Sequence, residues 1–213
     1  MMYGSFFIMK VLLINGSPHK EGCTFTALME VAGALAKNGV DSEIFHIGTK
    51  PMQGCTACMK CHSGLGRCVF RDEVYEALLP AVDACDGLVV GSPVYYAGAN
   101  GSLCALLDRL FFSLHGKFAG KPAAAVVSCR RGGASATFDR LNKYFTINQM
   151  PVVSSQYWNS VHGHTPDEVR KDAEGLQTMR TLGNNMAWLL KNIAEGKVPR
   201  PEQEPREVTN FIR

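Results

Sequence analysis

The chain has 213 residues, of which 46% are hydrophobic and 19% are charged, a balance that suits a globular core and excludes a disordered chain. Its formal net charge of +3 is too small to indicate a nucleic-acid surface. No apolar run approaches the roughly 20 residues that span a bilayer. We therefore expect neither a nucleic-acid partner nor a membrane anchor.

Residues 1–9 (MMYGSFFIM) are expected to form a short N-terminal extension rather than a signal peptide, because they lack a basic region and a cleavage site. The absence of an export signal predicts a cytoplasmic protein, in which thiols stay reduced. The eight cysteines then favour metal or redox roles over a disulfide scaffold.

Apolar, β-branched runs alternate with helical patterns over residues 10–194, which we expect to form one domain. In chain order we expect a strand at 10–15, a helix at 24–38, a strand at 41–47, a helix at 72–84 and a strand at 87–91. There follow a helix at 102–114, a strand at 122–128, a helix at 134–145, a strand at 152–158 and a long helix at 167–193. Residues 195–213, rich in Pro, Glu and Arg, are predicted to form a tail that is either extended or packed against a partner subunit.

Short apolar strands, each followed by a helix, predict an α/β fold with a parallel sheet covered on both faces. Five strands fit the flavodoxin-like, doubly wound order 2-1-3-4-5. Ligands bind such sheets at the carboxyl ends of the strands, where the winding reverses between strands one and three.

The first strand leads into a glycine-containing loop, N-G-S-P-H-K-E-G-C-T at residues 15–24, at which a helix begins. A helix N-terminus attracts phosphate through its unpaired N–H groups, and Ser17 and Thr24 add hydroxyl donors. The loop lacks the dinucleotide fingerprint G-x-G-x-x-G, and its glycines are wrongly spaced for a Walker A loop. The alternative is an ordinary strand–helix turn capped by Thr24.

Three motifs follow one another in the expected places: G-S-P at 16–18, S-P-V-Y at 92–95 and L-L-D-R at 106–109. Together they resemble the NADPH-dependent FMN reductase family, over roughly residues 10–193. The resemblance implies FMN held by three loops. The phosphate would lie on Ser17, Gly22, Cys23 and Thr24, the ring against Pro93, Val94, Tyr95 and Tyr96, and a third contact would come from Ser128, Arg131, Gly132 and Gly133. Many relatives have Asn where this chain has Cys23.

Four cysteines follow the second strand in the pattern C-x2-C-x2-C-x6-C. Thiolates so close in sequence can converge on one metal site. The pattern resembles the iron-sulfur flavoprotein branch of the same family, which implies a [4Fe–4S] cluster on Cys55, Cys58, Cys61 and Cys68. Two alternatives stay open: a cysteine-rich loop that holds no metal, and a structural zinc site.

No pattern of catalytic side chains stands out, which fits a protein whose flavin carries the chemistry. The resemblance implies an enzyme that passes electrons from NAD(P)H through FMN to a flavin, a quinone or another small acceptor. An alternative is an iron-sulfur flavoprotein that relays electrons from a ferredoxin-like partner through the cluster to FMN. A third is a flavin-binding module without turnover. The resemblance also implies a homodimer or homotetramer.

Overall fold

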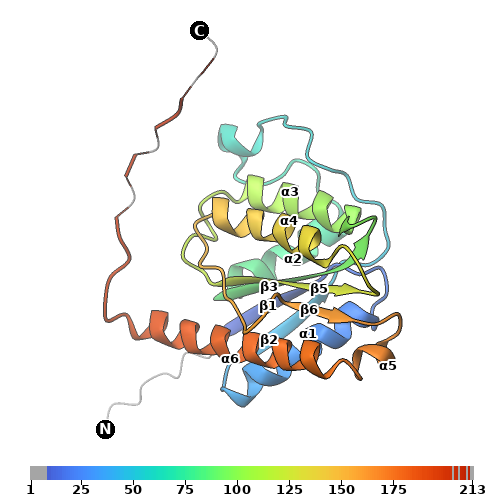
Figure 1. Ribbon diagram of the computed structural model, residues 1–213. Coiled ribbons are helices and arrows are strands. Elements are labelled where there is room, and N and C mark those ends of the chain that lie inside the picture. The colour runs from blue at the N-terminus through green and yellow to red at the C-terminus, as the bar shows by residue number, and fades with distance from the viewer. Residues whose placement is uncertain (1–8, 203, 206, 210, 212–213) are drawn as a thin grey trace.

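A computed structural model describes residues 9–202, 204–205, 207–209 and 211. A central sheet lies between two layers of helices (Figure 1). The strands are β1 (Lys10–Asn15), β2 (Asp41–His46), β3 (Gly87–Tyr95), β4 (Gly98–Ala99), β5 (Ala123–Cys129) and β6 (Ser160–His162). The helices are α1 (Cys23–Lys37), α2 (Glu73–Ala84), α3 (Gly101–Ser113), α4 (Ala134–Ile147), α5 (Pro166–Val169) and α6 (Ala173–Glu195), with a short helical turn, η1 (Cys61–Leu65).

The sheet confirms the predicted fold class and winding. Its main strands run parallel in the order β2-β1-β3-β5-β6, and the short β4 pairs antiparallel with β3 off this path. The order is therefore the expected one with a two-residue strand added. Asn15 is in register with His46 of β2 and with Gly91 of β3, so the carboxyl ends of the three strands reach the same edge.

Alternate residues of the central strands β1, β3 and β5 face opposite helical layers, as a sheet buried on both sides requires. In β1, Leu12 and Ile14 belong to the core that packs against α2, α3 and α4, whereas Val11 and Leu13 belong to the core under α1 and α6. The two layers are visible above and below the sheet in Figure 1.

The prediction of a strand at residues 152–158 is wrong. Val152 forms only an isolated bridge with Ala123, and the chain then leaves the sheet, with Tyr157 and Trp158 more than half exposed. The chain rejoins the edge at β6. In the gap, the buried side chain of Asn159 donates to the carbonyl of Ala125 at 3.0 Å. The apolar run resembled a strand, but a side-chain amide takes the place of part of the backbone ladder.

The single long helix expected at 167–193 is also wrong, because it is divided into α5 and α6. Asp172 lies at the break, where its carboxylate accepts from the backbone N–H of Gly175 at 2.9 Å and of His162 at 2.7 Å. An N-cap of this kind starts a new helix and fixes it to the end of β6. By contrast, the strand predicted at 87–91 is longer than expected, since β3 continues to Tyr95.

Apart from residue 9, the predicted N-terminal extension lies outside the described residues. The described residues beyond Gly196 contain no helix or strand, and Arg200 donates to the carbonyl of Ala119 at 2.7 Å and to the Gln149 side chain at 3.2 Å. The tail therefore contacts the domain at this point. None of the described helices is both long enough and apolar enough to cross a bilayer.

Candidate cofactor site

The candidate site lies at the carboxyl edge of the sheet, where the loop after β1 contacts β3. The N–H of Gly16 donates to the carbonyl of Gly91 at 2.8 Å. A Cβ on Gly16 would lie 2.7 Å from that oxygen and 2.4 Å from Cδ2 of Leu103, so no larger side chain fits. Glycine is required here for close approach of the two backbones.

At the N-terminus of α1, the positive end of the helix dipole is not capped by a described side chain. Gly22 is the N-cap, and no side chain of the described residues forms a capping hydrogen bond there. The N–H groups of the first helical turn, which begins at Cys23, have no acceptor within the helix. Together with the helix dipole they suit an anion such as a phosphate.

The two hydroxyls predicted to contact phosphate are both buried. The Oγ of Ser17 accepts from the N–H of His19 at 3.1 Å, which leaves the hydroxyl hydrogen of Ser17 for another acceptor. Thr24 shares a 2.8 Å hydrogen bond with Ser128 at the end of β5. The Thr24 hydroxyl thus joins the first predicted loop to the third.

The Cys23 side chain contacts the loop after β6. Its Sγ lies 3.8 Å from the carbonyl oxygen of Gly163, and burial raises the pKa of the thiol. The neutral thiol therefore serves as a weak donor to the loop after β6.

The second predicted loop is the hairpin between β3 and β4. Tyr96 and Ala97, its two central residues, have φ angles of 48° and 57°, values typical of the type I′ turns that usually contain Asn and Gly. Tyr96 is fully exposed and Tyr95 about half exposed, whereas Pro93 and Val94 are partly buried. Two tyrosine rings are therefore displayed at the edge of the sheet, in a backbone conformation that is strained for a bulky residue.

The third predicted loop contacts this hairpin at Gly133, which has φ of 90° and caps α4. A Cβ on Gly133 would lie 2.7 Å from Cα of Ala97 and 2.8 Å from Cγ1 of Val94. Arg131 and Gly132 are exposed beside it. The structure thus brings the three predicted loops together through Gly16, the Thr24 hydroxyl and Gly133.

The four predicted cysteine ligands lie on the long segment after β2, which rises beyond α3 in Figure 1. Cys55 and Cys58 are exposed, Cys61 is half-buried and Cys68 is buried. Burial raises the pKa of the Cys61 thiol, and the nearby Cys58 and Cys55 add to the effect. Four thiols are a suitable donor set for a thiolate-bound cluster. In the described part of the chain, however, no three Cys, His, Asp or Glu side chains are arranged to hold a metal ion.

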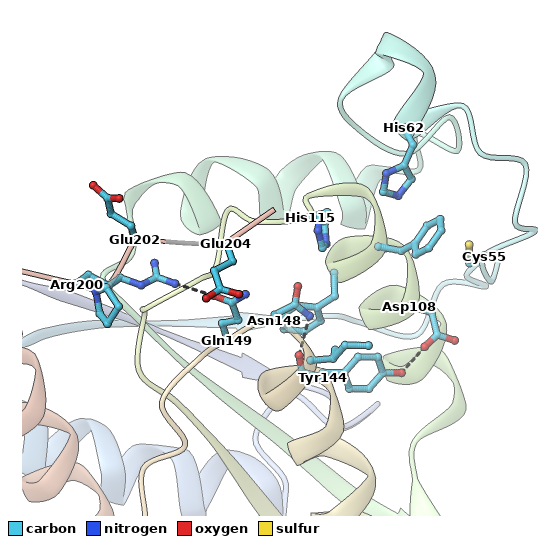
Figure 2. A pocket seen from close by; sticks show the side chains of 14 residues that line it. Cys55, His62, Asp108, His115, Tyr144, Asn148, Gln149, Arg200, Glu202 and Glu204 are labelled. Atoms are coloured by element: carbon cyan, nitrogen blue, oxygen red, sulfur yellow. Dashed lines mark hydrogen bonds between the residues drawn. The ribbon is translucent and has the colours of Figure 1, made fainter. Parts of the chain in front are cut away.

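A separate hollow of about 1210 Å³ lies between α3, α4 and the tail, and none of the predicted FMN contacts lines it. Figure 2 shows His62 and Cys55 of the cysteine segment at one side and Arg200 and Glu202 of the tail at the other. At its base Tyr144 donates to Asp108, and burial together with this carboxylate raises the pKa of the phenol far above its usual value. Sequence analysis missed this hollow, although Asp108 belongs to the L-L-D-R motif.

Comparisons with known proteins identify a matching family and several relatives. The family model described as NADPH-dependent FMN reductase matches residues 9–165. An iron-sulfur flavoprotein of Methanocaldococcus jannaschii is 34% identical over 195 residues, covering 87% of this chain and 99% of its own length. An iron-sulfur flavoprotein of Methanosarcina thermophila is 29% identical, covering 89% and 99%.

Solved structures show the same fold at low identity. RosB with a bound 8-demethyl-8-formylriboflavin-5′-phosphate intermediate has a TM-score of 0.67 and 13% identity, covering 96% of this chain and 92% of its own. An NAD(P)H:quinone oxidoreductase from Methanothermobacter marburgensis has a TM-score of 0.64 and 15% identity, covering 84% and 96%.

Proposed function

This chain belongs to the NADPH-dependent FMN reductase family, and from that membership we propose that it is an FMN-dependent oxidoreductase whose cysteine segment holds a [4Fe–4S] cluster. The observation that carries the flavin part is the meeting of three loops at the carboxyl edge of β1, β3 and β5, beside an α1 N-terminus that lacks a side-chain cap. When bound, FMN would supply the redox chemistry by accepting electrons and passing them on.

The protein's own residues would bind and orient the flavin. The first turn of α1 would receive the phosphate, with the Ser17 hydroxyl as an additional donor. The Thr24–Ser128 hydrogen bond keeps the phosphate loop close to β5. Tyr95 and Tyr96 would lie beside the ring, where their exposed faces can stack on it.

The cluster proposal rests on the four thiols and on the names of the relatives, which are iron-sulfur flavoproteins. Because the described cysteines are not gathered, cluster binding requires the segment to rearrange, as is usual for metal sites whose folding is coupled to binding. Cys68 is already buried, whereas Cys55 and Cys58 are exposed. Electrons would then arrive from a ferredoxin-like partner and leave to a small-molecule acceptor.

A second candidate is a plain reductase in which NAD(P)H reduces FMN directly and the cysteine segment holds no cluster. The description of the matching family model favours this candidate. It is also favoured by the arrangement of the described cysteines, whose thiols do not converge on one metal position. In either case we propose a homodimer or homotetramer in the cytoplasm, without nucleic-acid or membrane partners.

The composition of anaerobically purified protein tests both candidates. We expect FMN together with about four irons and four sulfides per chain, from the stoichiometry of the cluster. Cys58→Ser should remove the iron and leave FMN bound, because the flavin loops belong to other elements. Cys104→Ser, a matched change on α3 outside the segment, should keep both. Flavin without iron, together with four segment thiols that react with alkylating reagents, would contradict the cluster and leave the plain reductase.

A further inference from the structure

Arg109, at the middle of α3, has a side chain with no exposed surface, although it carries a permanent charge. Its Nη1 donates to the carbonyl of Gln53 at 3.1 Å and to the carboxylate of Asp72 at 2.5 Å. Its Nη2 donates to the carbonyl of Phe70 at 2.7 Å. One guanidinium therefore binds the backbone on both sides of the four cysteines, since residues 53 and 70 bracket all of them.

Tyr75 extends this contact to the fourth cysteine. The guanidinium carbon lies 4.8 Å from the centre of the Tyr75 ring. The buried phenol oxygen accepts from the backbone N–H of Cys68 at 3.1 Å and shares a 2.7 Å hydrogen bond with Ser113. The backbone at Cys68 is thereby fixed to α2 and α3, whereas Cys55 and Cys58 are exposed.

Burying a cation costs desolvation free energy, and only well-placed hydrogen-bond and ion-pair partners offset that cost. Here the compensation is incomplete, since Nε of Arg109 has no hydrogen-bond partner among the described residues. An apolar side chain could fill the same space beside the Tyr75 ring. What it could not do is bind the two backbone carbonyls and the carboxylate that caps α2.

Holding both ends of a long segment lowers the entropy lost when residues within it are brought together. The L-L-D-R motif that contains Arg109 has no part in the flavin site described above. We propose that Arg109 is a positioning residue for the cluster: it closes the base of the 53–70 segment, with Tyr75, so that the four thiolates can reach one [4Fe–4S] group. The inference rests on the proposed cluster and adds the residue that assembles its ligands.

The test compares the iron-to-FMN ratio of full-length variants after identical anaerobic reconstitution. Arg109→Met keeps the length of the side chain and removes the charge and the donors. Arg109→Lys keeps the charge but cannot present a planar fork to three acceptors. The matched control is Arg71→Met, because Arg71 is an exposed arginine beside the same segment whose side chain, among the described residues, pairs with Glu76 alone. FMN content and the urea midpoint of unfolding are measured on each protein.

We expect the iron-to-FMN ratio of Arg109→Met to fall about tenfold or more, as for other changes behind metal ligands, with FMN per chain unchanged. Arg109→Lys should not restore the ratio, and Arg71→Met should match the wild type. A wild-type ratio in Arg109→Met overturns the inference. A parallel loss of iron, FMN and stability also overturns it, because general support of the fold would then explain the effect.

Tyr75→Phe keeps the test decisive if Arg109→Met does not fold, because it removes only the hydroxyl. We expect it to lower the iron-to-FMN ratio and, in cluster-free protein, to speed alkylation of the buried Cys68 but not of the exposed Cys55. An unchanged ratio and an unchanged Cys68 rate overturn the inference. Wild-type protein that reconstitutes with FMN but never with iron overturns the proposed cluster itself, an outcome distinct from a fully loaded Arg109→Met.

Discussion

Replacing Gly16 by alanine tests whether close backbone contact between β1 and β3 builds the flavin site. The new Cβ would lie 2.7 Å from the carbonyl oxygen of Gly91, a backbone atom that cannot turn aside, and 2.4 Å from Leu103. Overpacking of this kind costs about 1–3 kcal/mol. If the loop moves away from β3, the 2.8 Å hydrogen bond from the Gly16 N–H to Gly91 is also lost, at about 1 kcal/mol. We therefore expect a total loss of about 2–4 kcal/mol.

Gly33→Ala is the matched control, because the same methyl group on α1 meets no atom within 4 Å. Alanine at a helix interior should stabilise the protein by about 0.5–1 kcal/mol. Urea unfolding of the two variants should therefore shift in opposite directions. FMN titration should show at least about tenfold weaker binding for Gly16→Ala, the value of one lost charge-assisted contact. Wild-type stability and wild-type FMN affinity in Gly16→Ala would refute this reasoning.

Two further predictions concern the phosphate loop and the cap of α2. Ser17→Ala and Thr24→Ala should each weaken FMN binding about tenfold in equilibrium titrations but affect riboflavin binding much less. The Ser17 hydroxyl can donate to the phosphate, and the Thr24 hydroxyl fixes the phosphate loop to Ser128. Equal losses for both ligands would place the phosphate elsewhere. For Asp72, burial acts to raise the carboxyl pKa, but hydrogen bonds from the Tyr75 N–H and the Arg109 side chain outweigh it, so the pKa lies below the ordinary 3.8. The ionised carboxylate therefore stabilises the fold fully above pH 3.8, and this stabilisation is lost as the pH falls through the lowered pKa. In urea unfolding, Asp72→Ala should cost about 2–3 kcal/mol at pH 7 and much less at pH 2.5. An equal cost at both pH values would exclude the ionic contribution.

Local sequence patterns were sufficient to predict the fold class and the winding of the sheet. β1, β3 and β5 are short apolar runs, each leading into a helix, and the winding follows from the handedness of such units. The loop at residues 15–24 was recognisable because its glycines and hydroxyls lie within ten positions of one another. The four cysteines were recognisable for the same reason. Their roles as ligands of FMN and of a cluster stay predictions.

Tertiary structure decided the features that join residues far apart in sequence. The run at 152–158 leaves the sheet after its bridge to Ala123, and there the side-chain amide of Asn159 donates to the carbonyl of Ala125. Thr24, which the sequence offered as a phosphate donor or a cap, bonds to Ser128 more than a hundred residues away. In the sequence, Arg109 is the last residue of the L-L-D-R motif and its partners cannot be inferred. In the fold, its guanidinium donates to carbonyls at both ends of the cysteine segment. Periodicity reports only which face of an element is buried, whereas the partner of a buried polar group is chosen by the whole packed structure, since an unpaired group in the interior is costly.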